Sequence, residues 1–162
     1  MPLNERAVYD GYFHASPECW GVFGEVLAAE FSNAILFGAV HQLSVDTYAV
    51  QHAGGPHPDK SIGVHLCGLH LVSNCGVTSP NAPRLLQRLA SDVSVWPHFP
   101  PPRDMGELTV FDVAIAGSIE RHIETVRTWA DVVWNAWSSY HGDIAVLVKQ
   151  HLGFKRAVLP NP

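Results

Sequence analysis

The amino-acid sequence predicts an all-α protein with a four-helix-bundle-like core, two short extra helices and a long Pro-rich connection. Apolar residues recur at helical spacing in four long segments, and several of these segments follow a residue that commonly caps helices. Apolar residues make up 47% of the 162 residues and charged residues only 15%, so the chain can bury a core. We therefore expect a single helical domain over residues 1–162, with a lead-in segment at 1–15 and a tail at 154–162.

The first two helices are predicted from their caps and apolar stripes. Ser16 is the N-cap of a helix over residues 17–31, which has a proline at its first position. The apolar stripe of this helix comprises Trp20, Phe23, Leu27 and Phe31. Asn33 caps a second helix, which the segment Gly54-Gly55-Pro56 ends.

The third predicted helix runs over residues 59–74, and a shorter one follows over residues 81–90. The third helix has apolar residues at core spacing, namely Ile62, Leu66, Leu69 and Val72. Gly63 and Gly68 either weaken this helix or mark where another helix packs closely against it.

The segment 91–108 contains four of the twelve prolines and is predicted to be an extended loop over the surface. Thr109 caps a short helical turn after this loop. Ser118 then caps the longest helix, over residues 119–140, and a final short helix extends through His151. The chain therefore has four main helices and two minor ones, for which a bundle is the natural architecture.

Charge and composition exclude several classes of protein. The formal net charge is -5 and the ten Lys and Arg residues are scattered, which argues against nucleic-acid binding. No window approaches 18 uninterrupted apolar residues, so no membrane span is expected. The first residues show no basic stretch followed by an apolar one, so no secretory signal is expected, and the three cysteines make a poor disulfide framework. We therefore expect a cytoplasmic protein.

Helix directions bring four metal-capable side chains to one end of the predicted bundle. Short loops make the first three helices alternate in direction, and the loop 91–108 is expected to return the chain to the far end. Under that topology one end holds Cys19, His52, His65 and His141. Three imidazoles and a thiolate suit a divalent metal, zinc above all. A closed set of four ligands would be structural, whereas an open position would be catalytic.

Other residues near this end have expected roles of their own. Tyr48 and Asp46 are candidates for proton transfer or for orienting a ligand, and Asp46 is better placed beside the site than as a ligand. A nucleophilic pair of Cys19 and His52 is a weaker alternative, because no residue is identified that would orient the imidazole. Side chains interpreted as solvated or at the surface include His57, Glu30 and Trp129.

Several segments resemble a bacterial family of unknown function. They are SPECWGVFGEVLAAEFSN, HQLSVDTYAVQHAG, SIGVHLCGL, ELTVFDV and WADVVWNAWSSYHG, and together they cover roughly residues 16–142. We identify this family as domain-of-unknown-function family 5946. The matching positions include Cys19, Asp46, Tyr48, His52, His65, Trp137 and His141. The resemblance implies no established activity.

The sequence thus leaves two functions from different classes. The first is a small metal-binding protein, with enzymatic hydrolysis, transfer or lyase chemistry on a small molecule if the metal keeps an open position. The second is a non-catalytic helical module that binds a partner or forms a homodimer, with Trp129 and the Pro100-Pro101-Pro102 loop as contact elements. A tight cluster of the four proposed ligands beside a pocket favours the first function, and a large exposed apolar patch favours the second.

Overall fold

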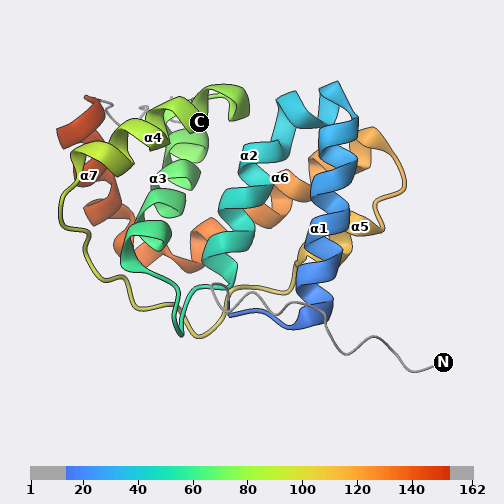
Figure 1. The fold of residues 1–162 in the computed structure, drawn as a ribbon, viewed down its shortest axis with the longest axis horizontal. Coiled ribbons are helices and arrows are strands. Elements are labelled where there is room, and N and C mark those ends of the chain that lie inside the picture. The colour runs from blue at the N-terminus through green and yellow to red at the C-terminus, as the bar shows by residue number, and fades with distance from the viewer. Residues whose placement is uncertain (1–13, 154–162) are drawn as a thin grey trace, which may run out of the picture.

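The structure, a computed structural model, describes residues 14–153 and is built from helices (Figure 1). Within this range there are seven α-helices, two short 3₁₀ helices and no strand, which confirms the all-α class. The predicted tail at 154–162 and residues 1–13 of the predicted lead-in lie outside the described residues. No helix in the described range is long and apolar enough to cross a membrane.

The first two helices begin where their caps predicted. Helix α1 spans Pro17–Ser32, and the Ser16 side chain accepts a hydrogen bond from the Cys19 N–H at 3.2 Å. Helix α2 spans Ala34–Gln51, and the Asn33 side chain caps its first turn. A single residue therefore joins the two helices, which places them side by side in opposite directions.

Helix α3 spans Asp59–Cys75 and ends at Gly76, whose φ of 70° is a left-handed conformation that suits glycine. A 3₁₀ turn at Ser79–Asn81 leads into helix α4, Ala82–Asp92. Both helices agree with their predicted positions to within about two residues at each end, the precision expected of helix boundaries.

The C-terminal helices follow a short one that closes the long loop. Helix α5 spans Val110–Ala114 behind a capping box formed by Thr109 and Asp112. Helix α6 spans Ile119–Ala136, and helix α7 spans His141–Leu152. The longest predicted helix is therefore wrong at its C-terminal end, because the Trp137 and Tyr140 N–H groups bond three residues back and tighten the chain into a 3₁₀ turn.

Helix α2 lies at the centre of the molecule and packs against α1, α3 and α6. In Figure 1, α6 crosses behind α2 on its way from α5 to α7. The Trp129 indole of α6 is fully buried and donates to the Gln51 side chain at 2.9 Å. The interpretation of Trp129 as a surface residue is thus wrong, because the crossing of α6 turns this side chain into the core.

The long connection between α4 and α5 runs along one end of the helices in Figure 1. Phe99 is buried, and the Trp96 ring lies against Gly63 of α3, where an added Cβ would be 2.2 Å from a ring carbon. Gly68 lies equally close to Asp46 of α2, since an added Cβ there would be 2.2 Å from a carboxyl oxygen. Both glycines therefore mark close packing, although at Gly63 the neighbour is the loop and not a helix.

Candidate functional site

Cys19 and His52 meet at the end where α1 begins and α2 ends. The Cys19 Sγ lies 3.3 Å from the His52 Nε2, and both residues are half-buried. The other ring nitrogen of His52, Nδ1, lies 3.0 Å from the Tyr48 carbonyl oxygen. A carbonyl only accepts, so Nδ1 carries the proton and Nε2 presents its lone pair to the thiol. The Tyr48 carbonyl is the orienting partner that the sequence did not reveal.

Burial keeps this pair uncharged. Desolvation raises the pKa of the Cys19 thiol, and a hydrogen bond with the Tyr48 side chain only partly opposes this rise in pKa. Desolvation likewise lowers the pKa of His52, because a buried imidazolium loses its hydration. A protonated thiol facing a neutral imidazole is therefore the form expected near neutral pH.

His65 and Asp46 form a second polar pair between α3 and α2. The His65 Nδ1 donates to the Asp46 Oδ1 at 2.8 Å, and the Gln42 side chain donates to the same oxygen at 2.9 Å. Asp46 is fully buried, and this burial raises its pKa more than His65 and Gln42 lower it. Because Nδ1 carries the proton, the His65 Nε2 also has a free lone pair.

His57 interacts with one histidine of each pair, His52 and His65. It is 5% exposed, its Nε2 lies 2.9 Å from the Ser61 hydroxyl, and it hydrogen-bonds the main chain of His52. Burial, followed by repulsion from His65, lowers the pKa of His57 to about 4. The interpretation of His57 as solvated is therefore wrong, because the loop between α2 and α3 folds it inward. Of the predicted site, Cys19 and His52 are thus in contact, and His65 interacts with the His57 ring that bonds the main chain of His52.

His141 has different neighbours. Its ring stacks on the Trp134 ring at 3.8 Å, and its Nε2 donates to the Trp134 carbonyl at 2.9 Å. The Trp134 indole in turn donates to Asn74 near the C-terminal end of α3. Asn74 lies nine residues beyond His65, about 13 Å along the helix axis. His141, the first residue of α7, therefore lies by the C-terminal part of α3 and not beside His65, since α6 ends before the predicted position.

The side chains of Cys19, His52 and His65 do not surround a common point. Across residues 14–153, no three His, Cys, Asp or Glu side chains are arranged so that they could hold a metal ion. What the structure brings together is one thiol–imidazole pair, one imidazole–carboxyl pair and the neutral His57 beside both. Of the two candidates for proton transfer, Tyr48 contacts the Cys19 thiol, and Asp46 is the carboxyl group of the second pair.

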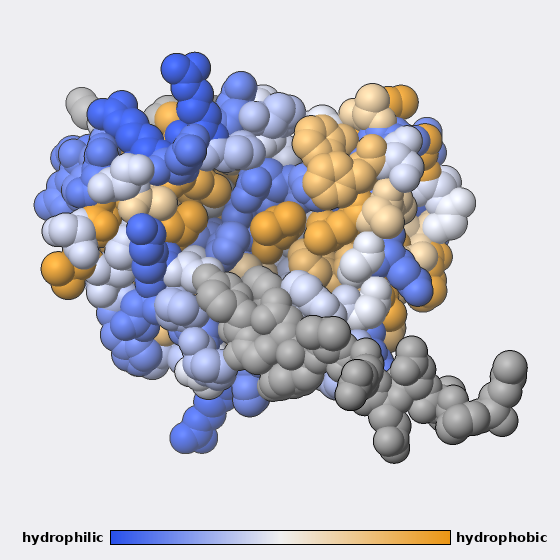
Figure 2. Space-filling model, in the orientation of Figure 1, coloured by the Kyte–Doolittle hydropathy of each residue, from blue (hydrophilic) through white to orange (hydrophobic). Residues whose placement is uncertain are grey.

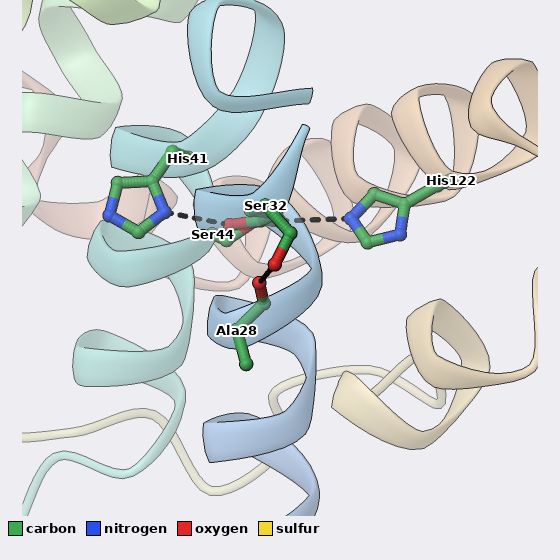
Figure 3. A network of polar contacts seen from close by, with 6 residues as sticks. Ala28, Ser32, His41, Ser44 and His122 are labelled. Atoms are coloured by element: carbon green, nitrogen blue, oxygen red, sulfur yellow. Dashed lines mark hydrogen bonds and ion pairs between the residues drawn. The ribbon is translucent and has the colours of Figure 1, made fainter. Parts of the chain in front are cut away.

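A separate polar cluster is buried where α1, α2 and α6 meet (Figure 3). Glu30 is fully buried, and its carboxyl group accepts hydrogen bonds from His41 at 3.0 Å, His122 at 2.9 Å and Ser44 at 2.6 Å. The two histidines approach from opposite sides. The interpretation of Glu30 as solvated is wrong, because side chains of α2 and His122 of α6 close around its carboxyl group.

This Glu30 cluster has little signal in the sequence. His41 is 11 residues from Glu30, so a short helical hairpin could have suggested that contact. His122 is 92 residues away, and only the crossing of α6 brings it to Glu30. Both carboxyl oxygens of Glu30 are hydrogen-bonded, so the cluster is best explained as a structural network that holds α1, α2 and α6 together.

Together, the fold and site define an all-α protein with a half-buried thiol–imidazole pair at one end of three consecutive helices. The chain belongs to a family described as a family of unknown function (DUF5946), whose family model matches residues 4–138. This confirms the resemblance seen in the sequence. No curated protein and no solved structure matches the chain.

Proposed function

We propose that this chain is a small metal-binding protein in which Cys19 and His52 hold a divalent metal ion, zinc above all. One observation carries the proposal: both His52 and His65 bond through Nδ1 to an acceptor, so each ring has its lone pair on Nε2, and that of His52 faces the Cys19 thiol. Metal-binding histidines usually have such a partner on the other nitrogen, because it fixes the tautomer and the ring orientation.

The separation of the two ligand atoms supports zinc. Two ligands at ordinary Zn–S and Zn–N distances in a tetrahedral site lie about 3.6 Å apart. The Cys19 Sγ and His52 Nε2 are 3.3 Å apart, so a metal could enter between them with a small adjustment. His65 is the third ligand in this proposal. It would reach the ion through a rearrangement of the loop that carries His57.

Burial favours metal binding over a free nucleophile at Cys19. Because the pKa of the thiol is raised, little thiolate is present for nucleophilic attack near neutral pH. A metal ion displaces the thiol proton and stabilises the thiolate directly. Asp46 would then position His65, and the Tyr48 hydroxyl would face the Cys19 sulfur. All three cysteines are free thiols, which supports a reducing cytoplasmic setting.

If solvent or a small molecule fills the fourth position, the metal would supply Lewis-acid chemistry for hydrolysis, transfer or a lyase reaction. The part played by this chain would be to hold the ion with two neutral imidazoles and one thiolate. Tyr48 would place a hydroxyl group beside that ion, where it can bond a bound molecule. His141, whose Nε2 is occupied by the Trp134 carbonyl, is not needed for this site.

Elemental analysis of the purified full chain after chelation and zinc reloading tests the proposal. We expect about one zinc ion per chain, and loss of that zinc in both Cys19→Ser and His65→Ala. His141→Ala and His98→Ala are the controls and should retain zinc, since His98 is exposed and bonds Asp59 instead. Absence of stoichiometric zinc in the folded wild type would overturn the metal site.

A second candidate function is a helical interaction module that forms a homodimer. The exposed residues at the junction of α1 and α2 favour it: Phe31 is 65% exposed, Ile35 62% and Phe37 44%. Figure 2 shows hydrophobic atoms gathered over the upper ends of these two helices. Such a patch is a common mark of an interface. In this second function the exposed patch, and not the buried Trp129, is the surface that contacts the partner.

Sedimentation velocity distinguishes this second function. If the junction of α1 and α2 is a dimer interface, the wild type sediments as a dimer and Ile35→Ser shifts it to a monomer, because a polar side chain enters the apolar contact. Val95→Ser is the matched control, because Val95 is 82% exposed on the distant loop. A wild type that sediments as a monomer at high concentration would exclude the homodimer.

A further inference from the structure

A groove on another face of the molecule lies between α2, α6 and the turn after α3. Its volume is about 410 Å³, which is within the usual range for small-molecule sites. One wall is apolar, with Leu43, Val72, Val77 and Ala130. Gly38 and Ala39 leave the side of α2 open, since nothing lies within 4 Å of a Cβ added at Gly38.

The groove contains one charge of each sign. Arg127 and Asp131 both line it, and they are the charged residues of its wall. They are four residues apart on α6, so they emerge on the same side of the helix. Neither forms an ion pair with another of the described residues. An Arg that precedes an acid along a helix is also the weaker orientation for an intrahelical pair. The Arg127 and Asp131 side chains therefore both remain available to a ligand.

Hydroxyl groups complete the polar side of the groove. Ser73, Thr78 and Ser79 line it opposite the helix that carries the two charges. Ser79 is 5% exposed, and its Oγ has no hydrogen-bond partner among residues 14–153. The Ser79 Oγ is enclosed by the protein, whereas Ser73 and Thr78 are exposed and their hydroxyl groups can hydrogen-bond a bound molecule.

We propose that this groove binds a small zwitterion of the aliphatic α-amino acid class. The Arg127 guanidinium would bind the carboxylate, for which its planar fork is suited. The Asp131 carboxylate would bind the ammonium group, and the hydroxyl groups of Ser73 and Thr78 would bond the ligand's polar end. The apolar wall then receives a branched aliphatic side chain. A simple anion would meet Asp131 without compensation, and a simple cation would meet Arg127, so the pair of charges selects a ligand that carries both.

Isothermal titration calorimetry on the full chain tests this site with L-leucine and L-valine as probes. We expect binding of L-leucine, and affinity lower by about tenfold or more for 4-methylpentanoate, which lacks the ammonium group, and for 3-methylbutylamine, which lacks the carboxylate. Arg127→Gln and Asp131→Asn should each weaken L-leucine by a similar factor. Arg121→Gln, an exposed arginine on the same helix outside the groove, should leave binding unchanged.

Two results would overturn the proposal. One is no binding of either amino acid to a wild type that unfolds cooperatively. The other is equal binding of 4-methylpentanoate and L-leucine, which would mean that Asp131 does not bind the ammonium group. Both variant positions are exposed on α6, so thermal unfolding should show that the substitutions leave the fold intact. The zinc content of the protein has no part in this experiment.

Discussion

Glu30→Ala is expected to lower the free energy of unfolding by about 3–5 kcal/mol, because it breaks a buried hydrogen-bond network. The substitution removes the one group that accepts from His41, His122 and Ser44 at the junction of three helices. Ser44 and His122 would then be buried without this partner, and each unsatisfied buried group costs about 1–3 kcal/mol. Urea unfolding followed by circular dichroism measures the change.

Two further variants separate the possible causes of this loss. Glu25→Ala lies on the same helix at an exposed position and should change stability by less than about 0.5 kcal/mol. Glu30→Gln keeps the shape of the side chain but donates where the carboxyl group accepted, so it should lose most of the stability that alanine loses. Wild-type stability in Glu30→Gln would show that the Glu30 cluster does not clamp the helices.

The second large effect is expected from Gly68→Ala. An added Cβ would lie 2.2 Å from the Asp46 Oδ2, and Asp46 is fully buried and cannot move away freely. The carboxyl group must shift, which breaks its bond with His65. Overpacking of this kind costs about 1–3 kcal/mol, and the lost hydrogen bond adds to it. Thermal unfolding measures the stability, and the nuclear magnetic resonance signals of His65 report the broken contact.

Gly142→Ala is the matched control for the alanine itself. Gly142 lies in the first turn of α7 with nothing within 4 Å of an added Cβ. Replacing it should stabilise the protein by up to about 1 kcal/mol, because glycine is a poor helix residue. If Gly68→Ala were as stable as Gly142→Ala, the close contact between α2 and α3 would not constrain the site.

The sequence predicted those features of the fold that depend on neighbouring residues. The caps at Ser16, Asn33, Thr109 and Ser118 are all present, because a cap needs only the next three residues. The end of α6 was missed, since apolar spacing continues from Trp134 through Trp137 to His141 although the backbone tightens after Ala136. Apolar spacing shows which face is buried but not where the helix stops.

The same limit explains the outcome at the site. Cys19 and His52 belong to consecutive helices with a short connection, so their contact follows from the alternating directions of α1 and α2. The position of His141 depended on the path of α6 after a long loop, which no local pattern specifies. The burial of Glu30 and of Trp129 depends on the same crossing helix. Whether Cys19 and His52 hold a metal stays a prediction.

The partners of Glu30 also have a consequence for the order in which the protein folds. His41 is 11 residues away along the chain, whereas His122 is 92 residues away. Closing the longer loop costs about 2 kcal/mol more in chain entropy. The hairpin of α1 and α2 should therefore form early, with Glu30 still open to water on the side that His122 later covers. Arrival of α6 then seals the carboxyl group, so weakening the His122 contact should mainly speed unfolding and leave the folding rate almost unchanged.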